Sequence, residues 1–248
     1  MKDNFSTESD KYARYRPAYP SEFYSFLKTI VSGTENAWDC ATGNGQVAEK
    51  IASIFKNVYA TDISQQQISN AVRLPNIHYS IQPAERTDFE NNFFDLIIVA
   101  QAVHWFDFEK FYFEVKRTGR SNSLIAVTGY ALLKTDPKVE DVIDKFYNNI
   151  VGIYWDNERR YVEEEYKTIP FPFEEITVPP FQSTYEWTLE HLFGYLGTWS
   201  AVKHYIKQNG RNPVALIEEE LTEAWGNIDK RTVHFPLITR IGKVNVTR

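Results

Sequence analysis

Along the first half of the chain, short runs of consecutive apolar residues alternate with stretches in which apolar side chains recur at helical spacing. The runs predict strands at 37–41, 58–62, 77–82, 94–101 and 124–130, and a helix is expected near 21–31 before the first of them. Residues 96–100 are all apolar, which is typical of a strand covered by helices on both faces. Strand, helix and strand at this spacing predict a parallel sheet.

After residue 130 the pattern changes. Residues 131–173 are mixed, rich in aromatics, and contain a helix-like stretch at 138–152. The pattern further along predicts strands at 176–178, 183–188 and 232–238 and helices at 189–208 and 213–225. We expect a single domain over 1–248, with an N-terminal covering segment at 1–35, a cofactor-binding core at 36–130, a lid insertion at 131–175 and the remaining strand and helices at 176–248.

A double-glycine turn follows the first predicted strand. Asp39 ends the apolar run, Gly43 and Gly45 come next, and a helix begins directly afterwards. Glycines let the backbone approach a ligand closely, and the first turn of a helix offers free N–H groups. This predicts a nucleotide-like cofactor, although the turn also matches the glycine fingerprint of dinucleotide dehydrogenases.

The surroundings of the turn separate the two cofactor classes. Asp62 ends the second strand, where a carboxylate can accept from both ribose hydroxyls, and this feature is common to both classes. Asp39 before the glycines and the long stretch that precedes the first strand favour S-adenosylmethionine over a nicotinamide dinucleotide.

Composition excludes several other functions. The formal net charge is −6, and no run of Lys or Arg is long enough to follow a phosphate backbone, so we expect no nucleic-acid partner. No stretch approaches the roughly 20 apolar residues of a membrane span, and the first residues do not resemble a signal sequence, which predicts a cytoplasmic protein without a membrane partner. Cys40, the single cysteine, lies in a predicted strand and is expected to be structural.

Taken in order, 39–45, Asp62, 83–85 and 94–106 resemble the class I S-adenosylmethionine-dependent methyltransferases. Residues 15–20, 100–107 and 195–201 further resemble the branch that includes trans-aconitate-methyltransferase-like small-molecule enzymes. The resemblance implies an α/β fold: a Rossmann-like, doubly wound, mostly parallel seven-stranded sheet with an antiparallel last strand and a helical lid insertion. The chain departs from that family at 118–123, where a Pro-Gly-Gly turn is common.

The resemblance also implies a set of site residues, none of them a metal ligand. Asp39 would meet the amino group of the methionine moiety, directly or through water. Asp62 would meet the ribose, and Arg16 the methionine carboxylate or an acidic acceptor. Its implied cofactor-binding residues are Arg16, Asp39, Ala41, Gly43, Gly45, Asp62, Ile63, Ala84, Glu85 and Gln101. His104 and Trp105 would lie near the transferred methyl group, His104 as general base or as an orienting group.

The acceptor is expected to be a small molecule, and a carboxylate is one candidate. Its pocket could be lined by six aromatic residues of the second half: Tyr154, Trp155, Phe171, Phe173, Trp187 and Trp199. Tyr12 and Tyr15 could fold over the cofactor with Arg16. A non-catalytic protein that binds S-adenosylmethionine and an NAD-dependent oxidoreductase remain alternatives, and the protein could be a monomer or a homodimer.

Overall fold

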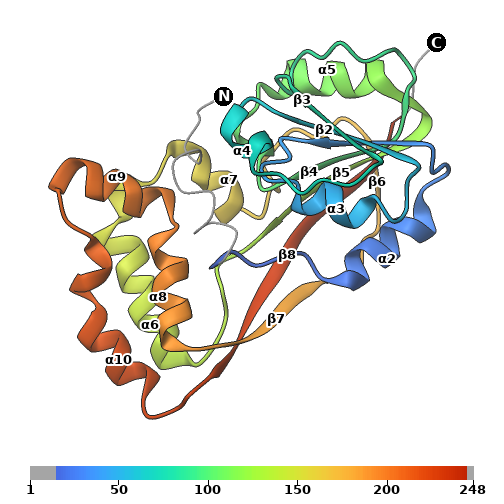
Figure 1. The fold of residues 1–248 in the computed structure, drawn as a ribbon. Helices are drawn as coiled ribbons and strands as arrows, with labels where there is room; N and C mark the ends of the chain where they lie inside the picture. Colours follow the sequence, from blue (N-terminus) through green and yellow to red (C-terminus); the bar gives the residue numbers. More distant parts are fainter. Residues whose placement is uncertain (1–14, 245–248) are drawn as a thin grey trace.

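The computed structural model describes residues 15–244 and contains one twisted β-sheet with helices on both sides (Figure 1). Neighbouring strands follow the order β3-β2-β1-β4-β5-β8-β6, and β7 pairs with β8 beside this path. The strands are β1 (Asn36–Cys40), β2 (Asn57–Asp62), β3 (Ile77–Ile81), β4 (Phe94–Ala100), β5 (Gly119–Tyr130), β6 (Glu174–Ile176), β7 (Gln182–Trp187) and β8 (Arg231–Val244).

Strands β1 to β5 are parallel, and β8 runs antiparallel to β5, β6 and β7. The predicted mostly parallel, seven-stranded sheet with an antiparallel last strand is therefore confirmed. β8 is longer than the predicted strand at 232–238 because its first half pairs with β7 and its second half with β5 and β6.

Polar side chains begin several of the helices. Ser64, Asp107, Asp136 and Thr188 each accept a hydrogen bond from a backbone N–H of the first turn. The helices are α2 (Ser21–Ile30), α3 (Gln46–Ile51), α4 (Gln65–Ser69), α5 (Phe108–Thr118), α6 (Pro137–Lys145), α7 (Arg160–Glu163), α8 (Leu189–Gly197), α9 (Ser200–Asn209) and α10 (Glu218–Trp225).

Each face of the sheet has its own core. Phe23 and Leu27 of α2 and Ile51 of α3 pack on one face, while Phe111 of α5 packs on the other face with Trp38 of β1. All five side chains are completely buried. β4 contributes side chains to both cores, which explains why residues 96–100 are all apolar, whereas Asp95 near its start pairs with Arg120.

A third core lies beyond the sheet, where β7 and β8 extend toward α6, α8, α9 and α10 (Figure 1). Of these helices, only α6 falls within 131–175, the predicted lid insertion; the other three come from 189–225. The helical layer beside the sheet is thus assembled from two separate stretches of the chain.

Several predicted helices are shorter or divided. The predicted helix at 189–208 is two helices, because Trp199 adopts an extended backbone and buries its ring beside Phe146 and Tyr147. The stretch 138–152 is helix α6 followed by a π-helical turn (Phe146–Ile150), and 213–225 is a 3₁₀ turn (Pro213–Leu216) followed by α10. Periodicity alone does not reveal where buried aromatic side chains interrupt a helix.

The unusual segment at 118–123 enters β5 directly. β5 begins at Gly119, its pairing with β4 shifts register between Phe94 and Leu96, and Asn122 adopts a positive φ of 65°. This irregularity lies at the amino-terminal end of β5, far along the strand from Tyr130 at its other end.

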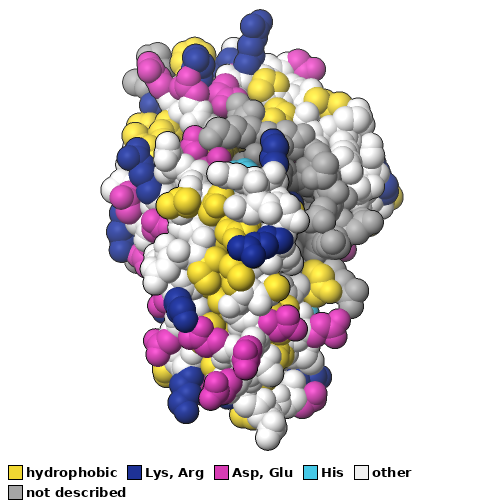
Figure 2. Space-filling model, turned by 90° about the vertical axis from the view of Figure 1, so that its left-hand side faces the viewer, with side chains coloured by type: hydrophobic (Ala, Val, Ile, Leu, Met, Phe, Trp, Pro, Cys, Tyr) yellow, Lys and Arg dark blue, Asp and Glu magenta, His cyan; other side chains and the backbone are white. Residues whose placement is uncertain are grey.

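Within residues 15–244, no helix is both long and apolar enough to cross a membrane, and no group of His, Cys, Asp and Glu side chains is arranged to hold a metal ion. Figure 2 shows basic and acidic side chains interspersed over the face that it presents. Cys40 is completely buried, and burial raises the pKa of its thiol well above the ordinary value.

Candidate functional site

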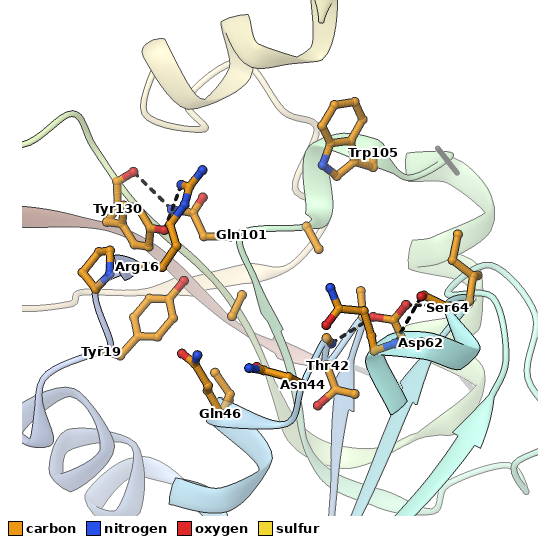
Figure 3. A pocket seen from close by; sticks show the side chains of 18 residues that line it. Arg16, Tyr19, Thr42, Asn44, Gln46, Asp62, Ser64, Gln101, Trp105 and Tyr130 are labelled. Atoms are coloured by element: carbon orange, nitrogen blue, oxygen red, sulfur yellow. Dashed lines mark hydrogen bonds between the residues drawn. The ribbon is translucent and has the colours of Figure 1, made fainter. Parts of the chain in front are cut away.

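A cavity opens at the carboxyl ends of β1, β2 and β4, beside the point between β1 and β4 at which the strand order reverses. Its wall comes from the loops that leave these strands, the start of α3 and the segment that precedes α2 (Figure 3). The lining residues are Arg16, Pro17, Tyr19, Ala41, Thr42, Gly43, Asn44, Gln46, Val47, Asp62, Ile63, Ser64, Gln67, Ala100, Gln101, Ala102, Trp105 and Tyr130.

The backbone at the floor of this cavity is unusual at two neighbouring strand ends. Ala41 follows β1 with φ 57°, and Gln101 follows β4 with φ 54°. A left-handed conformation costs a non-glycine residue about 1–3 kcal/mol, and such positions cluster at ligand sites. Both turns lead the chain away from the strand ends, which leaves room for a ligand between them.

Asp62 forms one side of the cavity and is tied to the loop opposite. One carboxylate oxygen accepts from the backbone N–H of Gly43 at 2.9 Å, and the other accepts from that of Ser64 at 2.9 Å. A carboxylate oxygen can accept from more than one donor. A half-buried carboxylate oriented at both oxygens is therefore a suitable acceptor for the hydroxyls of a ligand in the cavity.

Asp39 is not among the residues that line the cavity, so contact of its carboxylate with a ligand amino group, directly or through water, stays a prediction. Only 1% of the residue is exposed, and one carboxylate oxygen accepts from the Thr42 hydroxyl at 2.5 Å and from the backbone N–H of Ala48 at 2.9 Å. Burial raises the pKa of Asp39 to about 7, although these two hydrogen bonds oppose the shift. The observed contacts hold the glycine turn against the start of α3.

The two glycines of the turn differ in what surrounds them. A Cβ on Gly45, whose φ is 83°, would lie 2.2 Å from the Tyr79 hydroxyl, whereas a Cβ on Gly43, whose φ is 56°, would have no atom within 4 Å. The absence of a side chain at Gly45 therefore lets Tyr79 pack closely against the turn. The absence of a side chain at Gly43 leaves space in the cavity that Gly43 lines.

Arg16 lies across the cavity from Asp62 (Figure 3). Its guanidinium donates to the Tyr130 hydroxyl at 3.1 Å and to the Thr198 carbonyl at 3.1 Å, and it lies 5.5 Å from the centre of the Tyr195 ring. The cavity thus has an acidic side and a basic side, which suits a ligand that carries hydroxyls at one end and a carboxylate at the other.

A second cavity adjoins the first, and Arg16, Gln101, Trp105 and Tyr130 line both. Its remaining walls come from the helical layer, the loop before α7 and the residues that follow β4 and β5. They consist of His104, Ala131, Trp155, Asp156, Arg159, Tyr195, Trp199 and Ser200.

Arg159 brings a second positive charge to this cavity. Its Nε donates to the Tyr147 hydroxyl at 2.8 Å, and its guanidinium lies 4.9 Å from the centre of the Trp155 ring. Glu163 is hydrogen-bonded to the same Tyr147 hydroxyl. The guanidinium is thus held in place by an aromatic face and a phenol.

His104 lies in the wall of the second cavity and is 7% exposed. Its Nδ1 is 3.2 Å from the Tyr166 hydroxyl, and its ring packs against Trp105. Burial, helped by the nearby charge of Arg159, lowers the pKa of His104 to about 3. The ring is therefore neutral at physiological pH and is a weak base there.

The structure brings most of the predicted cofactor residues together. Arg16, Ala41, Gly43, Asp62, Ile63, Gln101 and Trp105 line the first cavity, while Asp39, Gly45, Ala84 and Glu85 do not. Ala84 is buried in the core beneath α5, and the Glu85 carboxylate accepts from the backbone N–H of Asp107 at 3.1 Å, at the start of that helix.

Only two of the six aromatic residues expected around an acceptor line the second cavity, Trp155 and Trp199. Phe171 and Phe173 pack on Tyr112 of α5, and Trp187 packs on Phe235 of β8. The fourth, Tyr154, packs on Tyr205 of α9. Tyr15 packs edge-on against His191, and Tyr12 lies outside the described residues.

Sequence reasoning missed several residues that line the cavities. Thr42, Asn44 and Gln46 lie within or next to the glycine turn, so the turn itself was the available signal. Arg159, which lines the second cavity, and Tyr166, which contacts His104 in its wall, lie in an irregular stretch around α7 that carries no motif. Nothing in their sequence surroundings distinguishes them from solvent-exposed residues.

Comparison with known proteins gives consistent matches. A family model described as a methyltransferase domain matches residues 38–127. A Dictyostelium discoideum protein named as a methyltransferase is 32% identical to this chain, over 97% of this chain and 95% of that protein. A Saccharomyces cerevisiae protein named as an S-adenosylmethionine-dependent methyltransferase is 26% identical over 51% of this chain and 47% of that protein.

Solved structures that are similar to this chain are also described as methyltransferases. One from Anaeromyxobacter dehalogenans, described as a type II methyltransferase, has 36% sequence identity and a TM-score of 0.86, covering 94% of this chain and 100% of that chain. Another, described as a methyltransferase from Bacillus halodurans, has 17% identity and a TM-score of 0.55 and is similar in fold.

Proposed function

Because this chain belongs to the S-adenosylmethionine-dependent methyltransferases, we propose that the first cavity binds the methyl donor and that the second cavity holds a small acceptor carrying a carboxylate. The observation that carries the proposal is that the two cavities share Arg16, Gln101, Trp105 and Tyr130. The dehydrogenase interpretation of the glycine turn was wrong.

In the proposed donor site, the adenosine end lies beside Asp62 and the methionine end beside Arg16. Asp62 would accept from the ribose hydroxyls, because its oxygens are oriented by Gly43 and Ser64 and a carboxylate oxygen can accept from more than one donor. Ile63 would pack on the adenine, and the Arg16 guanidinium would meet the methionine carboxylate. Asp39, Gly45, Ala84 and Glu85 would act indirectly, by shaping the loops.

The proposed acceptor site combines aromatic walls with positive charge. Trp155 and Trp199 would contact the apolar part of a small molecule, and Arg159 would pair with its carboxylate. A carboxylate oxygen is already ionised at neutral pH, so its methylation needs no base. Carboxylate recognition is also what we expect of the trans-aconitate-methyltransferase-like branch, to which we propose that this chain belongs.

We further propose that two parts of the chain cover the reaction. The segment before α2 contributes Arg16 and Tyr19 to the first cavity, and the helical layer contributes Trp199 to the second. Exclusion of water and alignment of the acceptor with the methyl group would then supply most of the rate enhancement, because the sulfonium is already an activated leaving group.

Calorimetry with S-adenosylhomocysteine and a transfer assay test the proposal. Asp62→Ala should weaken binding about tenfold to 100-fold, since it removes charge-assisted hydrogen bonds worth about 1.5–3 kcal/mol, while Asp229→Ala, at an exposed acid outside both cavities, should bind normally. Small carboxylic acids should be methylated and their matched amides should not. Absence of binding by the wild type would refute the donor site, and equal turnover of acids and amides would refute the carboxylate.

A further inference from the structure

Four residues from three parts of the chain lie close together beside the second cavity. His104 Nδ1 is 3.2 Å from the Tyr166 hydroxyl. A Cβ built on Gly129 of β5 would lie 2.9 Å from the same hydroxyl and 3.1 Å from the side-chain oxygen of Gln101. The missing side chain at Gly129 therefore leaves the space that the Tyr166 hydroxyl and the Gln101 amide occupy.

Tyr166 is held rigidly. Its side chain is completely buried, its backbone N–H donates to the Tyr161 carbonyl at 2.7 Å, and its own carbonyl accepts from Arg240 at 3.0 Å. Its backbone adopts a left-handed conformation, with φ 59°. A strained, buried residue whose hydroxyl ends beside a cavity-lining histidine is suited to orient that histidine.

We propose that Tyr166 is a positioning residue: its hydroxyl donates to Nδ1 of His104 and thereby keeps the ring proton on Nε2. The neutral imidazole has one donor and one acceptor nitrogen, so the hydrogen bond at one nitrogen fixes the role of the other. A phenol is a better donor than acceptor, because its oxygen lone pair is delocalised into the ring. The low pKa of His104 supports a neutral ring.

This arrangement, which rests on the proposed acceptor site, specifies what His104 does there. With the proton on Nε2, the ring offers an N–H to the acceptor and has no free nitrogen with which to remove a proton. His104 therefore orients an acceptor oxygen by donating a hydrogen bond, and it does not serve as general base. An acceptor that is already ionised, as a carboxylate is, needs no proton removed by His104.

Nitrogen-15 NMR of the histidine rings at neutral pH tests the proposal without any acceptor. The His104 signals are identified by their loss in His104→Gln, and the protonated and unprotonated ring nitrogens resonate far apart. The wild type should carry its proton on Nε2, and a proton on Nδ1 would overturn the proposal. This measurement requires no variant of Tyr166 to fold.

Tyr166→Phe removes only the hydroxyl and should allow the His104 proton to distribute between the two nitrogens. Tyr161→Phe is the matched control, because its hydroxyl contacts Arg160 and lies away from His104; it should keep the wild-type spectrum. Gly129→Ala, which crowds the Tyr166 hydroxyl, should disturb the tautomer in the same direction. A His104 spectrum unchanged in Tyr166→Phe would overturn the proposal.

Binding of S-adenosylhomocysteine, measured on the same proteins, separates this proposal from the proposed function. Tyr166 does not line the first cavity, so Tyr166→Phe should bind within about twofold of the wild type. Loss of binding in Tyr166→Phe alone would count against a role confined to His104. Absence of binding in the wild type would instead refute the donor site, whatever the tautomer.

Discussion

The two adjoining cavities are built in different ways. The first is shaped mainly by backbone: the left-handed turns at Ala41 and Gln101 and the N–H groups that hold Asp62. The second is shaped by side chains from distant segments, among them Arg159 near α7 and Trp199 before α9. We infer that the first is constrained by the sheet itself, whereas the second can change its chemistry by substitution of single side chains.

The difference has a functional meaning for a methyltransferase. The donor is the same in every member of such a family, and a cavity made by strand ends and tight turns keeps one shape. The acceptor differs from member to member, and a cavity lined by side chains of a separate helical layer can vary without disturbing the sheet. Arg16 and Gln101, which line both cavities, would couple the two.

The largest effect should come from Gly45→Ala, which disturbs the packing of the glycine turn that borders the first cavity. A Cβ there would lie 2.2 Å from the Tyr79 hydroxyl, which itself donates to the Val72 carbonyl at 2.6 Å. The left-handed backbone costs about 1–2 kcal/mol, and loss of the hydroxyl contact costs about 1 kcal/mol more. Thermal unfolding should therefore occur about 4–12 °C lower.

Gly43→Ala is the matched comparison, because its backbone is also left-handed but its Cβ would meet no atom within 4 Å. It should lower the stability less than Gly45→Ala does and weaken S-adenosylhomocysteine binding more, since Gly43 lines the cavity. If both variants lost stability equally, the distinction between a packing glycine and a cavity glycine would fail.

Arg159→Met should impair use of the acceptor in the second cavity and leave donor binding in the first cavity unchanged. Loss of one charge-assisted contact with an acidic acceptor corresponds to about 1.5–3 kcal/mol, or about tenfold to 100-fold in kcat/KM. Binding of S-adenosylhomocysteine should stay unchanged, because Arg159 does not line the first cavity. Steady-state kinetics with the best acid from the transfer assay, beside calorimetry, measure both quantities.

The neighbouring Arg160→Met provides the control. Arg160 is exposed, contacts Tyr161 and lines neither cavity, so both quantities should match those of the wild type. A loss of turnover in Arg160→Met equal to that in Arg159→Met would indicate a general effect of charge, and the specific contact would be excluded.

The same difference between the cavities explains which parts of the fold and of the candidate site could be predicted from the sequence. The strand at 94–100 and the glycine turn carry local signals, because burial on both faces and a left-handed backbone each restrict the residue types allowed. Gly43 in that turn, and Asp62 and Ile63 at the end of the next strand, were predicted from local patterns of this kind and line the first cavity. The buried, inward orientation of Asp39 could not be predicted, because an acid at a strand end can face a ligand or cap a helix.

The helical layer could be predicted only in outline. Trp187 and Trp199 have similar surroundings in the sequence, yet one packs on Phe235 in the core and the other lines the second cavity. Which aromatic faces the cavity depends on how α8 and α9 pack beyond the end of the sheet. Arg159 and Tyr166 depend on the same packing, so no local pattern could identify them.

Stability should also depend on pH in a way that involves one group near each cavity. Burial raises the pKa of Asp39 from 3.8 to about 7. Between these values the folded state keeps a proton that the unfolded state has lost, so Asp39 makes stability fall as pH rises. For His104 the folded pKa lies below its ordinary 6.5, at about 3, so its contribution to stability falls as pH falls below about 6.5.

Between about pH 4 and 6.5 the two contributions oppose each other, and the wild-type free energy of unfolding should be nearly level there. Asp39→Asn removes the contribution of Asp39, so its free energy of unfolding should rise with pH across this range, by at most about 1.4 kcal/mol per pH unit. His104→Gln removes the contribution of His104, so its free energy of unfolding should fall as pH rises. Urea unfolding at several pH values measures both. Parallel curves for the wild type and Asp39→Asn would mean that the Asp39 carboxylate is ionised when the protein is folded, and the hydrogen bonds from Thr42 and Ala48 would then outweigh its burial.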